Sequence, residues 1–318
     1  MALTLPEAAK LSTTDLQRGV IETFVQESTI LDRLPMLTIE GNSYAYNEEA
    51  TLPGVQFRAV NEAYAESTGT VNQKSESLVI LGGDADVDKF IVRTRGNLND
   101  QRAIQTRMKI KAAAFKFQDS FFNGDVATEP KGFDGLRKRL TGSQVISAGT
   151  NGAPIVGDGM NDSHAFFDKL DELVATVPGL TSANGAIYAN RKVISKIKSA
   201  ARRLGGYEMV NESLTGKWIP TYNGIPLLDP GQTAAGADIL PQAEAQGTAT
   251  DASSVYAVRF GQAEDDRAVT GLTNGGVQAY DLGELESKPA YRTRVEFYTG
   301  LAVFGGKGAA RLNGVLAK

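Results

Sequence analysis

The sequence contains no cysteine, one histidine and one tryptophan among its 318 residues. The lack of cysteine excludes disulfide bonds, thiolate zinc sites and cysteine nucleophiles together. Because His164 is the only histidine, a metal site built from several histidines is impossible. A catalytic triad that uses histidine has a single candidate for the same reason.

Long apolar runs are also missing. No uninterrupted run approaches the roughly 20 residues that a transmembrane helix needs, and the N-terminus lacks the basic-then-apolar pattern of a signal peptide. We therefore expect a soluble chain with no membrane partner. The net charge of −4 argues against a strongly basic nucleic-acid-binding module.

The first part of the chain changes character twice. Residues 1–35 have the spacing of an N-terminal arm with short helices. Residues 36–78 contain short alternating runs separated by Gly-Asn, Pro-Gly and Ser-Thr-Gly turns, a pattern typical of a long, acidic β-excursion with few core residues. The next stretch, from Leu78 to Arg95, predicts two strands around Gly82-Gly83.

The longest predicted helix covers Asn99–Phe122 and would be about 35 Å long. We predict one narrow apolar stripe on it and a basic opposite face, which indicates partners on both sides; a solvated face is the alternative. The stripe contains Ile104, Met108, Phe115 and Phe122, and the basic face contains Arg102, Arg107, Lys109, Lys111 and Lys116.

Two amphipathic helices and several short strands are predicted in the second half. The first helix begins with Asp162 or Ser163 as N-cap, and the second runs from an Asn190 cap to a Gly205 stop with six cations and no acid. The chain then ends in an alternating strand pair joined by a Gly-Gly-Lys-Gly turn at 305–308.

The motifs that could carry chemistry have the wrong spacing or context. In "FFNGDVATEPKGFDGL" the glycines Gly124 and Gly132 follow a helix and lack the Lys-Ser/Thr of a phosphate loop, so we predict a corner in which Gly124 ends the helix. Ser163 and His164 are consecutive residues at a helix start and do not converge on one substrate. We predict no catalytic residues, no metal and no cofactor.

The order of the segments resembles the major capsid proteins of tailed double-stranded DNA phages, whose Hong Kong 97-type fold encapsulin shells share. Four stretches carry the resemblance: "FFNGDVATEPKGFDGL", "WIPTYNGIPLLDPG", "VYAVRFGQAEDD" and "YRTRVEFYTGLAVFGGKGAARL". The resemblance implies an α+β fold with an N-terminal arm at 1–35 and an extended loop (E-loop) at 36–78. It further implies a peripheral (P) domain at 79–180 and 287–318 with a spine helix at 99–122, and an axial (A) domain at 181–286.

The function that the resemblance implies is a non-enzymatic shell subunit that assembles as hexamers and pentamers around double-stranded DNA. The DNA contact would be non-specific. Further partners would be a portal and decoration proteins, and assembly would use either a separate scaffolding protein or none. The chain would belong to the virion capsid and pass through the host cytoplasm during assembly. The alternatives are an encapsulin-like nanocompartment shell and an enzyme of unknown type.

The charge pattern predicts where neighbouring copies meet. The acidic excursion cannot bury a core alone, so we expect it to lie on the basic face of the long helix in the next copy. The predicted contact joins two sets of residues: Glu48, Glu49, Glu62 and Glu66 on one side, and Arg102, Arg107, Lys109 and Lys111 on the other.

Overall fold

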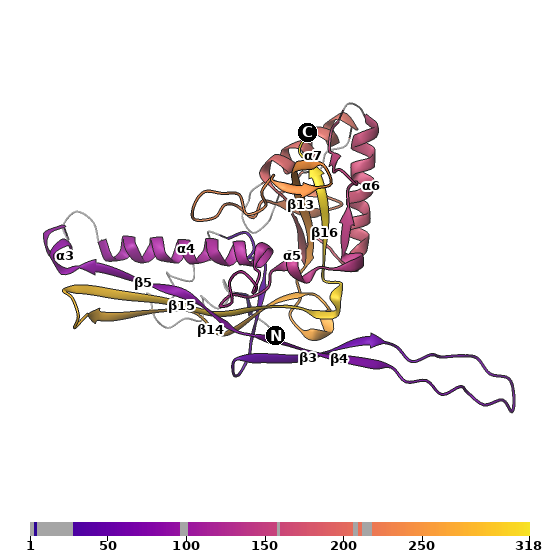
Figure 1. Ribbon diagram of the computed structural model, residues 1–318, viewed down its shortest axis with the longest axis horizontal. Helices are drawn as coiled ribbons and strands as arrows, with labels where there is room; N and C mark the ends of the chain where they lie inside the picture. Colours follow the sequence, from indigo (N-terminus) through magenta and orange to yellow (C-terminus); the bar gives the residue numbers. More distant parts are fainter. Residues whose placement is uncertain (1–2, 5–27, 96–100, 158–159, 206–208, 212–217) are drawn as a thin grey trace.

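The computed structural model describes residues 3–4, 28–95, 101–157, 160–205, 209–211 and 218–318. In this part of the chain the strands form three sheets of five, nine and two strands. Figure 1 shows the five-stranded sheet lying along the long helix, the nine-stranded sheet standing at one end of it, and the two-stranded hairpin projecting away from both. The predicted helices of the N-terminal arm lie outside the described residues.

The five-stranded sheet has the order β1-β2-β14-β15-β5. Its strands are β1 (Leu3–Thr4), β2 (Pro35–Thr38), β14 (Val269–Glu284), β15 (Ala290–Val303) and β5 (Val79–Asp88). The three long strands are antiparallel to their neighbours, with β15 between β14 and β5. Strand β14, predicted as part of the 181–286 segment, also pairs in parallel with β2, so its two partners come from both ends of the chain.

The long helix α4 (Gln101–Asn123) packs on this sheet through β5 and β15. The helix itself agrees with the sequence prediction, and of the predicted apolar stripe Phe122 is buried, whereas Ile104 and Met108 are exposed. The buried face includes small and polar side chains, because the helix lies close to the sheet and the sheet covers them. Its members are Thr106, Ile110, Ala113, Ala114, Phe117, Gln118, Phe121 and Phe122.

The predicted break at Gly82-Gly83 is absent, and β5 runs through it as one strand. A side chain at Gly82 would overlap the backbone carbonyl of Val295 on β15, so glycine here permits close strand contact and does not make a turn. The chain turns later, at α3 (Lys89–Arg95), where the Asp88 carboxylate accepts a hydrogen bond of 2.7 Å from the Phe90 amide.

The nine-stranded sheet has the order β6-β16-β13-β8-β11-β10-β9, with β7 beside β16 and β12 beside β13. Helices α6 (Met160–Thr176) and α7 (Arg191–Arg203) pack with it around a second apolar core. The strands are β6 (Val145–Ser147), β7 (Ala153–Pro154), β8 (Gly185–Tyr188), β9 (Met209–Asn211), β10 (Trp218–Tyr222), β11 (Ile225–Leu228), β12 (Glu244–Gln246), β13 (Ala249–Arg259) and β16 (Ala309–Leu316).

Local sequence signals explain where some helices and strands in this part of the chain begin or end. The Asn190 side chain caps α7 by accepting a hydrogen bond of 2.8 Å from the Lys192 amide, as predicted. Positive φ angles of 50° at Asn223 and 76° at Gly224 make the tight turn between β10 and β11. Neither predicted cap of α6 is right, because the helix has already begun at Met160 and the buried Ser163 hydroxyl donates to the Ile155 carbonyl.

The last two strands do not form the predicted hairpin. β15 belongs to the five-stranded sheet and β16 pairs with β13 in the nine-stranded sheet. Between them, Phe304–Gly306 forms a short 3-10 turn with a φ of 67° at Gly305. The glycine-rich stretch therefore carries the chain from one sheet to the other.

The sheets are joined by a corner and a shared core. After α4 the chain reverses at Gly124, whose carbonyl accepts a hydrogen bond of 2.9 Å from the Gly135 amide before the short helix α5 (Leu136–Arg139). The ring of Phe122, at the end of α4, lies 5.5 Å from Tyr188 and 5.1 Å from Tyr256, on two strands of the other sheet.

A buried ion pair fixes β12 to β16. Arg311 donates to Glu244 at 2.9 Å and to the Ser254 hydroxyl at 2.9 Å, and both charged side chains are almost fully buried. Removing one partner of such a pair leaves an uncompensated charge inside the protein.

We expect Glu244→Ala to lower the free energy of unfolding of the unassembled chain by about 3 kcal/mol, measured by urea denaturation. The matched control is Glu129→Ala, which breaks the exposed pair with Lys116 and should cost less than about 1 kcal/mol. Equal losses in the two variants would contradict the importance of burial at Glu244.

Candidate self-association surfaces

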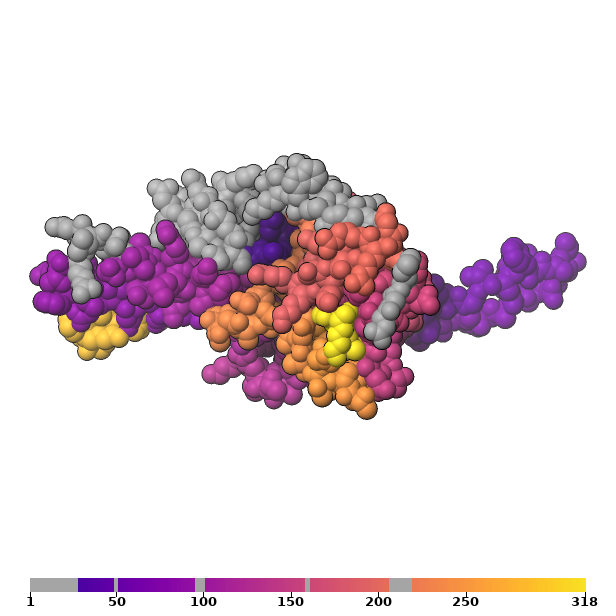
Figure 2. Space-filling model, turned by 90° about the horizontal axis from the view of Figure 1, so that it is seen from above, coloured from indigo at the N-terminus to yellow at the C-terminus, as the bar shows by residue number. Residues whose placement is uncertain are grey.

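The projecting hairpin consists of β3 (Ser43–Thr51), the loop 52–69 and β4 (Thr70–Ser77). Every residue from 51 to 75 is exposed, and Figure 2 shows the hairpin standing clear of the body. Large apolar side chains nevertheless gather near its end. They are Leu52, Val55 (95% exposed), Phe57 (fully exposed), Val60 (90% exposed) and Tyr64. Apolar side chains grouped in this way, with no cover from the described chain, indicate a surface that binds a partner.

The loop holds its shape through its own polar contacts. The Glu62 carboxylate accepts a hydrogen bond of 2.9 Å from the Ala59 amide, and the Arg58 guanidinium lies 5.1 Å from the Tyr64 ring centre. Ser67 donates to the carbonyl of Gly54 at 2.9 Å. These bonds shape the end of the hairpin without burying its apolar side chains.

The base of the projecting hairpin is fixed to the body at an aromatic cluster. The Tyr46 ring meets Phe304 edge-on with ring centres 4.9 Å apart, and burial, as the largest cause, raises the pKa of Tyr46 to about 12. Glu264 accepts a hydrogen bond of 3.1 Å from the Asn47 amide. On the other strand Glu76 forms a two-pronged pair with Arg139, at 2.5 and 2.8 Å.

Exposed apolar side chains also gather at the opposite end of the molecule. Figure 1 places α3 and the turn between β14 and β15 at the end of the long axis that faces away from the hairpin tip. We call these side chains the far-end residues: Phe90 and Ile91 on α3, Ile104 and Met108 on α4, and Tyr280 and Leu282 on β14. The sequence prediction placed two of them in the core and missed the other four.

The predicted acidic contacts are partly engaged within the chain. Glu48 forms an ion pair of 2.5 Å with Lys74 across the hairpin, and Glu62 holds the loop. Glu66 is exposed and makes no hydrogen bond or ion pair with the described residues. Glu49 lies on β3, and its side chain is outside the described atoms.

The predicted basic contacts lie on α4, away from the hairpin of the same chain (Figure 1). Arg102 forms an ion pair of 2.5 Å with Asp281, and Lys111 lies 5.5 Å from the ring centre of Phe115. The stem of Lys109 covers Gly83, whereas Arg107 is exposed. The structure thus separates the two predicted sets within one chain, and their contact between copies stays a prediction.

The open face of the five-stranded sheet carries ordered charge pairs. Arg294 binds Asp84 at 2.7 and 3.0 Å, and Arg292 binds Asp86 at 2.7 and 2.8 Å. These hydrogen bonds from arginine are the largest cause of the lowered pKa of each carboxyl. Both aspartates therefore remain ionised at neutral pH, and this face is polar, unlike the two ends.

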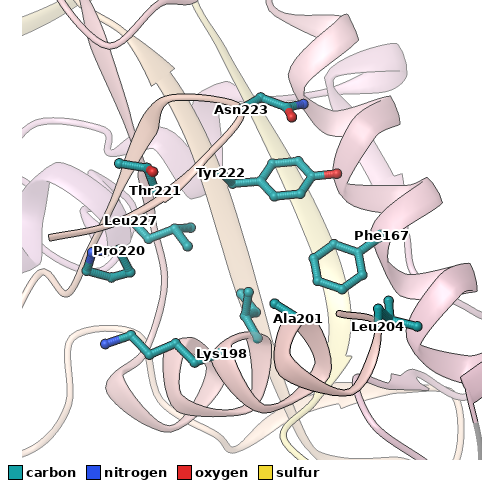
Figure 3. A pocket seen from close by; sticks show the side chains of 10 residues that line it. Phe167, Lys198, Ala201, Leu204, Pro220, Thr221, Tyr222, Asn223 and Leu227 are labelled. Carbon is teal, nitrogen blue, oxygen red and sulfur yellow. The ribbon is translucent and has the colours of Figure 1, made fainter. Parts of the chain in front are cut away.

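An apolar cavity near α7 is lined by residues that do not combine into a catalytic group. Its volume is about 270 Å³, and Figure 3 shows Phe167, Leu204, Pro220 and Leu227 around it, with Lys198 at the rim. The Tyr222 hydroxyl at its wall is used in a hydrogen bond of 2.6 Å to Asp171, a contact that contributes, after burial, to raising the pKa of Tyr222.

Other chemical candidates are equally isolated. His164 is exposed on the first turns of α6. Within the described residues no cluster of three histidines, aspartates or glutamates could hold a metal ion. No helix in the same part of the chain is long and apolar enough to cross a membrane.

Residues 13–157 match the model of a protein family described as major capsid protein GP7. This match includes the projecting hairpin, α4 and the corner that follows it. No curated protein matches the sequence.

Solved shell proteins share the fold at low sequence identity. The SrpI encapsulin from Synechococcus elongatus aligns with a TM-score of 0.66 at 19% identity, over 100% of this chain and 98% of that chain. The capsid protein of a native GTA particle gives 0.65 at 13% identity, over 91% and 90%. The capsid protein of cyanophage P-SCSP1u gives 0.55 at 14% identity, over 90% and 87%. The α+β fold that the sequence predicted is confirmed.

Proposed function

We propose that this chain is a major capsid protein with the Hong Kong 97-type fold and that many copies of it close into an icosahedral shell around double-stranded DNA. The observation that supports this most directly is the projecting hairpin, whose apolar end has no cover from the described chain. A side chain such as Phe57 gains about 1.5–3 kcal/mol when it is buried, so an uncovered group of them favours association.

The arrangement of the two exposed ends supports closed assembly over a simple dimer. The hairpin tip and the far-end residues differ in sequence and shape, so a contact that joins one to the other is of the head-to-tail type. Head-to-tail contacts continue from copy to copy, and they form a ring where the rotation between copies closes. Rings of five and six copies are what an icosahedral shell requires, and we propose these as the assembly units.

The domain division given by the sequence is part of this proposal: arm at 1–35, E-loop at 36–78, P domain at 79–180 and 287–318, and A domain at 181–286. The place of β14 beside β15, which in turn pairs with β5, suggests that 269–284 be counted with the P domain. The chain acts without turnover chemistry, and its further partners are the packaged DNA, a scaffolding protein, a portal and decoration proteins. Assembly takes place in the host cytoplasm before the chain resides in the virion.

The charge contact between copies can be tested at Glu66. Because Glu66 makes no hydrogen bond or ion pair with the described residues, its replacement should leave the folded subunit unchanged. We expect Glu66→Lys to raise the protein concentration needed for assembly at low salt by about tenfold, because like charges on facing surfaces repel. Light scattering and electron microscopy measure it, with Asp168→Lys on α6 as the control of equal charge change.

Combining Glu66→Lys with Arg107→Glu should restore part of the assembly if these two residues face each other across the interface. High salt should reduce the defect of the single variant, since exposed charges are screened. Unchanged assembly of Glu66→Lys at every salt concentration would overturn the predicted acidic–basic contact while leaving the shell function intact.

An encapsulin-like compartment is the second candidate, favoured by the alignment of the SrpI encapsulin with 100% of this chain. The contents of shells purified from the native source separate the two proposals. Nuclease-protected double-stranded DNA supports the capsid, and shells that contain protein but no DNA support the compartment.

A further inference from the structure

Helix α7 carries a concentration of positive charge, most of which makes no ion pair with the described residues. Its 13 residues include six cations and no acid, in a chain of net charge −4. Arg191 lies 3.3 Å from Asp229. The charge of Lys192 contributes, after hydrogen bonds from Gln232 and Asn190, to lowering the pKa of the Asp238 carboxyl. The remaining four make no ion pair with the described residues: Lys196, Lys198, Arg202 and Arg203.

This arrangement costs helix stability. Lys192 and Lys196, and likewise Lys198 and Arg202, are four residues apart, where like charges destabilise a helix by about 0.2–0.5 kcal/mol per pair. Neighbouring α6 shows the opposite pattern, since Lys169 there is paired with Glu172 at 2.7 Å. The unpaired charge on α7 is therefore better explained by an external anion than by folding.

The cations form two rows along the exposed side of the helix. At about 100° per residue, Arg191, Lys198 and Arg202 follow one line and Lys192, Lys196 and Arg203 another. Ser195 and Ser199 lie between the rows, and the apolar residues Val193, Ile194, Ile197 and Ala200 are buried on the other side. The strip between the rows is thus small and polar.

We propose that this exposed side of α7 binds the phosphate backbone of the packaged nucleic acid. The inference rests on the proposed function and adds the surface that contacts the contents of the shell. Two rows of cations beside short serine side chains allow a linear polyanion to lie along the helix. Contact through phosphates alone is independent of sequence, as packaging of a whole genome requires.

The composition of the surface argues against another protein as the occupant. Protein interfaces depend on buried aromatic and apolar anchors surrounded by a polar rim. The exposed side of α7 presents lysine, arginine and serine, and its apolar residues face the core. A second copy bound there through acidic groups alone would lack such anchors.

The test compares two triple variants of equal charge change. Lys196→Gln, Arg202→Gln and Arg203→Gln remove cations from α7, and Lys131→Gln, Lys307→Gln and Lys318→Gln remove the same number elsewhere on the surface. Fluorescence anisotropy with a short mixed-sequence DNA duplex measures binding by the unassembled full chain over a series of salt concentrations. Electron microscopy measures assembly, and thermal unfolding checks the fold.

We expect the α7 variant to bind the duplex at least tenfold more weakly at low salt. The slope of log K against log salt should fall by about 3, close to one unit for each cation removed. The control variant should keep at least two thirds of the wild-type slope, and both variants should still form shells.

Three results with the variants would overturn the proposal. They are equal losses of DNA binding in both variants, unchanged DNA binding in the α7 variant, and a loss of assembly in the α7 variant with DNA binding intact, which would make α7 an interface between copies. Wild-type shells that form while the chain shows no DNA binding would refute this inference alone, whereas a wild-type chain that never assembles would refute the proposed function.

Discussion

Replacing the exposed phenylalanine at the end of the projecting hairpin should raise the protein concentration needed for assembly while leaving the folded subunit unchanged. Phe57 contacts no core in the described chain, so we expect Phe57→Ser to change the free energy of unfolding by less than about 0.5 kcal/mol. If Phe57 is buried in the next copy, its loss removes about 2 kcal/mol from each contact. That is roughly a 30-fold higher protein concentration for assembly.

Light scattering against protein concentration measures this effect, and urea denaturation of the unassembled chain measures stability. Val126→Ser is the matched control, because Val126 is an exposed apolar residue at the corner after α4, outside both apolar ends. Phe57→Leu should retain assembly, since it keeps most of the buried apolar area. Assembly of Phe57→Ser at the wild-type concentration would show that the hairpin tip is not an interface.

The second large effect is expected at the corner where α4 ends. A methyl group at Gly124 would overlap the backbone carbonyl oxygens of Phe133 and Ser120, neither of which can move without disturbing α4 or the turn. We expect Gly124→Ala to lower the free energy of unfolding by about 2–3 kcal/mol, measured by urea denaturation of the unassembled chain.

Gly132→Ala, eight residues further along the same corner, is the internal control. A methyl group there would come no closer than 3.3 Å to the Glu129 carbonyl, and its backbone angle suits any residue. We expect a change of less than about 1 kcal/mol, with either sign, because alanine also restricts the unfolded chain. A Gly124→Ala chain as stable as Gly132→Ala would mean that the corner relaxes at little cost.

Several elements could be predicted because local chemistry decides them. The cap at Asn190 begins α7 with the predicted hydrogen bond, and α4, which is described from Gln101 onward, ends one residue after the predicted Phe122. The turn at Glu129–Gly132 closes with a hydrogen bond of 2.9 Å inside the predicted corner. Gly124 does follow the helix, although close backbone contact, and not a left-handed angle, is the reason for glycine.

The errors arose where contacts distant in the sequence decide the structure. The buried face of α4 includes Thr106 and Gln118 because the helix lies close to the sheet, and the periodicity of apolar residues does not predict that these polar residues are buried. Gly82 resembles a turn residue, but its reason is the neighbouring strand β15. Apolar and polar residues alternate in β15 and β16 as in the two strands of a hairpin, yet each strand pairs with strands from another part of the chain.

The candidate surfaces were predictable in part. The sequence shows that residues 36–78 have little core of their own, and from this the projecting hairpin follows. The alternation of Val55 and Phe57 has the form of an ordinary strand and gave no sign that both side chains are exposed. The far-end residues were missed because exposure depends on where the helix and sheet end in space.

The attachment of the projecting hairpin at one end only has a geometric consequence. Beyond the cluster of Tyr46 and Phe304, the two strands have no second layer in the described chain to stiffen them, so the ribbon can twist and bend at small cost. An icosahedral shell requires chemically identical subunits to meet at unequal angles around its five-fold and six-fold axes. In the proposed shell, a rigid body with one compliant arm would satisfy both angles without repacking either core, and we infer that the root of the hairpin is where local curvature is set.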